Sequence, residues 1–171
     1  GWLRLNSQRS GFEVIGERAE VVRRIFDGTL RGVGQHSLAE TLNREGVPVF
    51  GRGKMWQRSY INKILGNPAV IGTFTPHRTE RINGKRVRIS TDPIQGYFPA
   101  IVEPETFERV AAMISARPPY VQSPVVNILA GLARCPICEA TMTRVNKGYN
   151  PKGGKPYLVC TRAKVGAGCD Y

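Results

Sequence analysis

The segment Cys135-Pro136-Ile137-Cys138, together with Cys160 and Cys169, decides the fold of the C-terminal part of the chain. Two residues separate the first pair of cysteines, 21 residues separate Cys138 from Cys160, and eight separate Cys160 from Cys169. A two-residue gap lets the backbone turn so that two thiolates face one metal ion, and 21 residues are enough for a hairpin that returns the chain to it. We therefore expect all four cysteines to bind one structural Zn²⁺.

The small size of this module also favours a metal. Residues 127–171 are too few to bury much core, and metal binding supplies folding free energy. The alternatives are one or two disulfides, or a redox-active Cys-x-x-Cys pair. Thiols stay reduced in an intracellular protein, and the redox alternative lacks its βαβ context. Strand-like runs at 129–134, 141–145 and 157–160 are expected around the metal.

Residues 119–126 precede this module and are predicted to be a linker, which leaves 1–118 as a first domain. Apolar spacing within the first domain predicts helices over 17–30, 37–45, 59–65 and 104–116. Alternating or turn-bounded runs predict hairpins over 1–16 and 81–89 and a strand over 70–74. The predicted fold class is α+β: a mixed helical and β-hairpin domain with a small zinc-ribbon module.

Two local signals mark element boundaries in the first domain. Ser37 and Glu40 have the spacing of a capping box, in which each side chain binds a free backbone N–H at a helix start. Asn83-Gly84 is the favoured two-residue hairpin turn, because both positions need positive φ.

The charge of the chain points to a polyanionic partner. Its 171 residues include 25 Lys and Arg against 13 Asp and Glu, which gives a net charge of +12, and the pI is about 10.1. DNA, RNA and anionic membranes all fit such a charge. No run approaches the roughly 20 apolar residues of a membrane helix, so no membrane partner is expected.

The first residues, Gly1-Trp2-Leu3-Arg4, carry no Met and no signal-peptide pattern, and are expected to lie inside a longer protein. The expected location is the cytoplasm.

The positive charge concentrates in the connector before the helix at 59–65, on that helix, in the 81–89 hairpin and in the C-terminal module. The helices at 37–45 and 59–65 suggest a helix-turn-helix variant with a long connector. Contacts to phosphates give affinity, and a helix or ribbon in the major groove gives sequence discrimination. The predicted DNA contacts are Arg52, Lys54, Gln57, Arg58, Tyr60, Asn62, Lys63, Arg78, Arg81, Lys85, Arg86, Arg88, Arg144, Lys147, Lys152 and Lys155.

For each of these residues taken alone, the competing interpretation is a solvated surface position. Four apolar neighbours of the second helix are expected in the core instead: Trp56, Ile61, Ile64 and Leu65.

The sequence shows no catalytic pattern. His36 and His77 are far apart and have no obvious carboxylate partner, and no serine lies in a nucleophile-elbow or triad signature. A phosphate-cradling glycine loop is also missing. We expect no catalytic residue and no small-molecule substrate in this segment.

Several motifs in order resemble the recombinase domain and zinc ribbon of the large serine recombinases. They are Gly1-Trp2, the run 19–26, the run 37–47, Trp56, the run 64–68, Gly72, the run 99–102, and 129–132 before Cys135 and Cys138. That family usually places glycine after each paired cysteine, whereas Pro136 and Glu139 stand there in this chain.

This resemblance implies a multidomain parent protein. A resolvase-like domain ahead of this segment would carry the nucleophilic serine, and the recombinase domain and zinc ribbon would each bind part of an attachment half-site in double-stranded DNA. Four parent subunits would form the synaptic tetramer. Two alternatives stay open: a non-catalytic transcriptional regulator with a zinc ribbon, and an RNA-binding module, which the scarcity of aromatic residues in the basic stretches disfavours.

Overall fold

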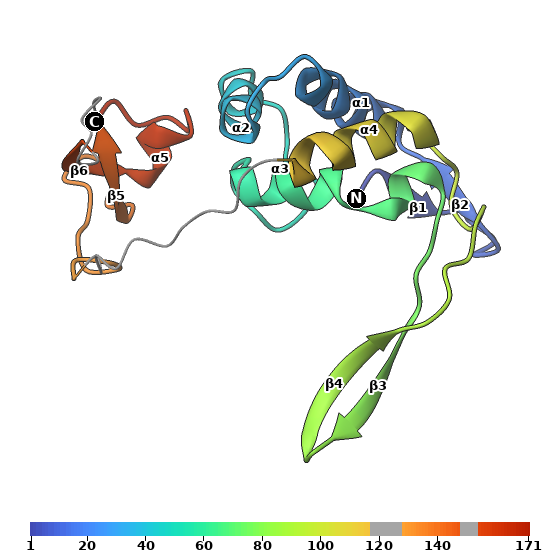
Figure 1. The fold of residues 1–171 in the computed structure, drawn as a ribbon. Helices are drawn as coiled ribbons and strands as arrows, with labels where there is room; N and C mark the ends of the chain where they lie inside the picture. The colour runs from blue at the N-terminus through green and yellow to red at the C-terminus, as the bar shows by residue number, and fades with distance from the viewer. Residues whose placement is uncertain (117–127, 148–153) are drawn as a thin grey trace. The chain divides into compact units, whose positions relative to one another are not determined.

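The computed structural model describes residues 1–116, 128–147 and 154–171, and confirms the α+β class (Figure 1). Contacts divide the chain into two compact units. Unit 1 comprises Gly1–Val33 and Ser59–Arg117, and unit 2 comprises Gly34–Arg58 and Pro118–Tyr171. The predicted linker at 119–126 lies outside the described residues. Among the helices of the described ranges, none combines the length and apolar character needed to cross a membrane.

Unit 1 is built on the packing of two predicted helices, α1 (Gly16–Leu30) and α4 (Pro104–Ser115). Pro104 starts α4 because its fixed φ suits the first helical turn. The rings of Phe26 and Phe107 lie 6.2 Å apart between these helices. Val110 is fully buried, but Ala111 of the predicted apolar face is exposed, so the buried stripe of α4 is narrower than expected.

The remaining short elements of unit 1 start and end near their predicted positions. Strands β1 (Leu3–Leu5) and β2 (Phe12–Val14) pair antiparallel as the predicted N-terminal hairpin. Helix α3 (Arg58–Leu65) buries Ile61, Ile64 and Leu65, as expected of its apolar side.

The predicted strand at 70–74 is wrong. A 3₁₀ turn, η1 (Pro68–Ile71), occupies its first two residues, and Phe74 forms only an isolated bridge with Ile94. The Asn67 side chain accepts a hydrogen bond from the Ala69 N–H, and Pro68 fixes a helical φ. This local cap outweighs the strand preference of the buried apolar residues that follow.

A long basic hairpin leaves unit 1 after this turn. Among the described residues, strands β3 (His77–Ile82) and β4 (Lys85–Ser90) pair only with each other, and extend beyond the predicted 81–89 (Figure 1). Asn83 and Gly84 have φ values of 51° and 76°, which confirms the predicted two-residue turn.

Unit 2 contains helix α2 (Gln35–Arg44), which starts two residues before the predicted position. Gly34 is its N-cap and no side chain caps it, so the predicted capping box of Ser37 and Glu40 is wrong. Both residues lie inside the helix, and Glu40 forms an ion pair with Arg44 at 2.7 Å.

The side chain of Asn43 at the end of α2 connects three segments of unit 2. It accepts a hydrogen bond from the Trp56 N–H at 2.7 Å and donates to the carbonyl oxygens of Trp56 and Val165. The indole of Trp56 is fully buried, as predicted, and its ring packs edge-on against Phe50.

The cysteine-containing part of unit 2 forms around strands β5 (Met142–Lys147) and β6 (Lys155–Cys160) and the short helix α5 (Thr161–Lys164). Both strands match predicted runs. The expected strand at 129–134 is wrong: residues 128–132 form turns, and only Arg134 pairs, in an isolated bridge with Thr141. Gly131 has a φ of 77°, which no extended strand accommodates.

Gly72 lies where the chain leaves the helical part of unit 1 to form the β3–β4 hairpin, and it contacts the segment that returns from the hairpin. Its φ is +83°, its carbonyl accepts the Phe98 N–H, and a Cβ added to it would lie 2.7 Å from the Phe98 oxygen. The Val70 carbonyl accepts two further N–H groups, from Ile101 and Val102. Both glycine's conformational freedom and its lack of a side chain are needed here.

We expect Gly72→Ala to lower the free energy of unfolding by about 1–3 kcal/mol, because alanine is strained at this φ and its Cβ displaces the returning segment at Phe98. Urea denaturation of the 171-residue chain measures this loss. Gly16→Ala is the matched control: a Cβ there meets nothing within 4 Å. Equal stability of the two variants would contradict the assigned role of Gly72.

Candidate metal centre and nucleic-acid interface

The structure brings all four predicted metal ligands together. The sulfur atoms of Cys135, Cys138, Cys160 and Cys169 lie within 4.8 Å of one another. The Sγ atoms of Cys135 and Cys169 are 3.8 Å apart, and those of Cys138 and Cys160 are 3.5 Å apart. All four cysteines are free, since a disulfide needs sulfur atoms about 2.05 Å apart.

These separations fit a tetrahedral metal ion. A Zn–S bond of about 2.3 Å places tetrahedral thiolate sulfurs about 3.8 Å from one another. Cys135 and Cys160 are buried, whereas Cys138 and Cys169 are partly exposed. The donor set therefore suits a structural Zn²⁺ whose coordination is completed by protein.

Backbone hydrogen bonds and strand pairing position the cysteines of the cluster. The Cys135 N–H donates to Ala140 and the Glu139 N–H donates to Cys135, which closes the turn around Cys138. Glu139 has a φ of 57° at a position where the resembled family usually has glycine. On the returning strand, Cys160 pairs directly with Met142, so the β5–β6 register fixes its position.

Without a metal, the thiols of Cys160 and Cys169 differ in pKa. Burial raises the pKa of the Cys160 thiol, but hydrogen bonds from the Ala163 backbone and from neighbouring thiols lower its net pKa to about 7. The Tyr171 backbone lowers the pKa of Cys169, while burial and the bonds to the other thiols raise it to about 12. The Cys160 thiolate is thus available near neutrality, whereas Cys169 must lose a proton to bind a metal.

Positive side chains lie beside the cluster. A hollow of about 390 Å³ in unit 2 is lined by Lys54, Arg162, Cys138 and Glu139, among other residues. The buried Nε of Arg162 has no hydrogen-bond partner in the described ranges. Lys54, predicted from sequence as a DNA contact, therefore also lines the hollow beside Cys138. Sequence reasoning did not identify Arg162.

The β3–β4 hairpin divides its predicted DNA contacts between two faces. Opposite residues and residues two apart share a face of a ribbon. The register pairs Arg81 with Arg86 and Thr79 with Arg88, which places these arginines on one face. Arg78 and Lys85 lie on the other face. Sequence reasoning missed Thr79 and Ser90, because only the register shows that their hydroxyls accompany the arginines.

The exposed residues of α3 and of the connector before it are consistent with their predicted roles. Arg58, Asn62 and Lys63 are exposed on α3, opposite its buried apolar residues, while Tyr60 is partly buried and burial raises its pKa. In the connector, Arg52 and Gln57 are exposed.

In the ribbon of unit 2, Lys147 pairs opposite Lys155 and lies 6.0 Å from the ring centre of Tyr157. Arg144 is partly buried on the opposite face. Lys152 lies outside the described residues.

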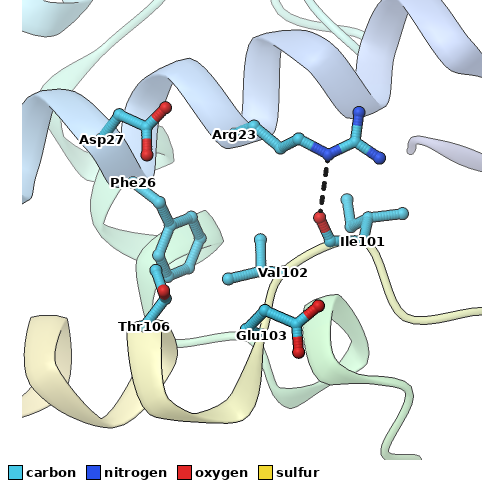
Figure 2. A pocket seen from close by; sticks show the side chains of 7 residues that line it. All are labelled: Arg23, Phe26, Asp27, Ile101, Val102, Glu103 and Thr106. Carbon is cyan, nitrogen blue, oxygen red and sulfur yellow. Dashed lines mark hydrogen bonds between the residues drawn. The ribbon is translucent and has the colours of Figure 1, made fainter.

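A hollow between α1 and α4 has the opposite charge character (Figure 2). It measures about 230 Å³ and is lined by Asp27, Glu103, Phe26 and Val102, among other residues. Arg23 borders it, donating to the Ile101 carbonyl oxygen at 3.1 Å (Figure 2). Arg23 therefore offsets part of the negative charge of the two carboxylates in this hollow.

Comparison with known families identifies the chain. The Recombinase family model matches residues 16–117, more than half of the chain, and the Recombinase zinc beta ribbon domain matches residues 128–171. The chain therefore belongs to the Recombinase family, which confirms the resemblance stated from the sequence. The four-cysteine cluster lies within the zinc beta ribbon match.

Curated relatives extend beyond the matched region. The chain is 28% identical over 148 residues to "Uncharacterized protein YbcK" of Escherichia coli (strain K12), covering 82% of this chain and 28% of that protein. It is 26% identical over 180 residues to "Putative DNA recombinase" of Bacillus subtilis (strain 168), covering 92% of this chain and 34% of that protein. The chain thus spans about a third of the length of these relatives or less.

Two solved structures are also similar. One is described as a crystal structure of an LSR-DNA complex, with a TM-score of 0.48, 19% identity, and coverage of 95% of this chain and 47% of that one. The other concerns sequence requirements of the Listeria innocua prophage attP site, with a TM-score of 0.47, 18% identity, and coverage of 95% and 64%.

We expect Zn²⁺ affinity to fall steeply as pH falls from 8 to 6. Metal binding must displace thiol protons, and below pH about 7 the Cys160 thiol is protonated as well. Competition with a chromogenic chelator at each pH measures the affinity, and metal analysis should give one ion per chain. Cys138→Ser should lose the ion. A pH-independent affinity, or retention of zinc by this variant, would contradict a four-thiolate site.

Proposed function

We propose that this chain binds double-stranded DNA sequence-specifically, at attachment half-sites, as the DNA-binding portion of a serine site-specific recombinase. Membership of the Recombinase family supports this assignment. The observation that carries it is the exposure of the predicted contacts: in the described ranges all of them are solvent-exposed except Tyr60 and Arg144, which are partly buried. Exposed cations on helices and ribbons suit phosphates and groove edges.

The proposal includes a structural Zn²⁺ held by the four cysteines. The sulfur separations and the zinc beta ribbon match support it. The chemistry supplied by such an ion is cross-linking: it holds the Cys135–Cys138 turn against the end of β6. We also retain the division into domains 1–118 and 127–171, which the separate family matches support.

The proposal places catalysis and assembly in the parent protein. This segment would hold DNA for a catalytic serine contributed by another domain, and four parent subunits would assemble at synapsis. Two linked DNA-binding modules gain affinity from each other when both sites can be reached at once. Because the chain covers about a third or less of the length of its curated relatives, the recombination reaction of the parent protein is itself a proposal.

Selection of duplexes from a random DNA pool by the zinc-loaded chain tests the function. We expect a long, defined motif, bound at least about 10³-fold more tightly than unselected DNA at moderate salt. Selection of single-stranded RNA instead would favour an RNA-binding module. Failure to enrich any motif, with binding that vanishes as salt rises, would overturn sequence-specific recognition.

Removal of the α3 charges should weaken binding to the selected duplex. We expect Arg58→Ala with Lys63→Ala to lower affinity at least about tenfold and to reduce the salt slope by about 1.8, the value for two lost phosphate contacts. Arg31→Ala with Arg109→Ala, two exposed cations of unit 1 outside α3, is the charge-matched control. Equal effects of the two double variants in fluorescence anisotropy titrations would exclude α3 from the interface.

A further inference from the structure

We propose that the β3–β4 hairpin binds the phosphate backbone of duplex DNA through one face only, the face of Arg81, Arg86 and Arg88. This inference rests on the proposed DNA-binding function and deepens it, by naming the surface and the chemical group it contacts. The opposite face of the same ribbon, which carries Arg78 and Lys85, stays away from the phosphates, so this inference removes these two residues from the set of DNA contacts predicted from the sequence.

The register of the ribbon separates two chemically different faces. The first face, which we call the arginine face, is formed by three opposite pairs: His77 with Ser90, Thr79 with Arg88, and Arg81 with Arg86. It contains three arginines, two hydroxyl side chains and a histidine, with no carboxylate. Every one of these side chains offers a hydrogen-bond donor to a phosphate oxygen.

The second face has a mixed composition. It pairs Arg78 with Ile89, Glu80 with Val87, and Ile82 with Lys85. Arg78 donates to Glu80 at 2.8 Å, so part of its charge is already neutralised. Three aliphatic side chains occupy half of this face, and Lys85 is its one remaining cation. A phosphate backbone would meet little here that binds it.

The arginine face carries an electrostatic cost in the free protein. Like charges directly opposite each other destabilise a strand pair, because their Cβ atoms are roughly 5 Å apart. Arg81 and Arg86 are such a pair, and within the described ranges neither their side chains nor that of Arg88 make a hydrogen bond or ion pair. The one acid of the hairpin, Glu80, lies on the other face. A polyanion against the arginine face removes this repulsion.

Exposure agrees with a surface ribbon. All residues of β3 and β4 are exposed except Glu80 and Ile89, which are partly buried. The base of the ribbon is held by the Phe74–Ile94 bridge, by the bond from the Thr91 N–H to Pro76, and by the Thr73 hydroxyl bound to Gln95 at 2.6 Å. These contacts fix the strands at their root, so the two faces keep their identity along the ribbon.

Two charge-matched double variants test the inference. Arg81→Gln with Arg86→Gln removes two cations from the arginine face, and Arg78→Gln with Lys85→Gln removes two from the other. Each is titrated as the zinc-loaded 171-residue chain against a random-sequence 30-base-pair duplex between 50 and 200 mM salt, since phosphate contacts do not depend on sequence. Circular dichroism checks the fold of each variant.

We expect the arginine-face variant to reduce the slope of log affinity against log salt by about 1.8. Its affinity deficit relative to wild type should be about tenfold larger at 50 mM than at 200 mM salt. The variant of the other face should keep a slope within about 0.5 of wild type. Without DNA, the arginine-face variant should show slower amide exchange in β3 and β4, because the repulsion between Arg81 and Arg86 is gone.

The outcomes separate this inference from the proposed function. If the wild-type chain does not bind any duplex, the proposed function fails. If wild type binds and the two double variants lose affinity and slope equally, or the Arg78/Lys85 variant loses more, the face assignment is overturned while DNA binding stands. Selective loss of binding to single-stranded RNA or anionic vesicles, with duplex binding intact, would also overturn it.

Discussion

The closure of the chain at Gly72 is the constraint on which unit 1 depends. The chain leaves the helical part at this residue and returns at Phe98, and the carbonyl groups of Val70 and Gly72 accept the returning N–H groups. A positive φ and a 2.7 Å approach to the Phe98 oxygen leave no room for a side chain. Because the return is fixed there, the segment through Ile101 reaches α1, where Arg23 binds it, and α4 starts in position to pack on α1.

In unit 2 the cysteine cluster brings distant segments of the chain together, as Gly72 does in unit 1. The turn around Cys138 and the end of β6 have few apolar neighbours: the buried side chains of this cluster are Cys135, Met142 and Cys160. Such a core is too small to hold the turn and the hairpin together by apolar burial, so a metal bound by all four thiolates would supply most of the stabilisation. Lys54 and Arg162 place positive charge beside that site.

Sequence reasoning succeeded where a local pattern has one physical solution. Asn83-Gly84 specified a turn with two positive φ values, and the cysteine spacing specified a cluster. It failed where a local helix cap competed with strand propensity. The cap at Asn67-Pro68 starts a 3₁₀ turn that takes up the first two residues of the expected strand at 70–74. It could not predict contacts between distant segments. Asn43 and Val165 are 122 residues apart, and no local pattern around either residue indicates their hydrogen bond.

The same limit applies to the predicted DNA contacts. A list of basic residues in a hairpin says that the ribbon is cationic, but a shift of one residue in register would exchange its faces. The turn at Asn83 fixes that register and so decides which cations act together. No side chain of the β3–β4 ribbon is fully buried, so its opposed cations depend on a turn and a base that are secured independently. The contacts around Gly72 and Thr73 do this for Arg81 and Arg86. In the second ribbon the metal cluster would do it for Lys147 and Lys155, with the Tyr157 ring easing their repulsion. In both cases the part that stabilises the ribbon is separate from the part that carries its charge, so charges can be changed at the tip without loss of the fold.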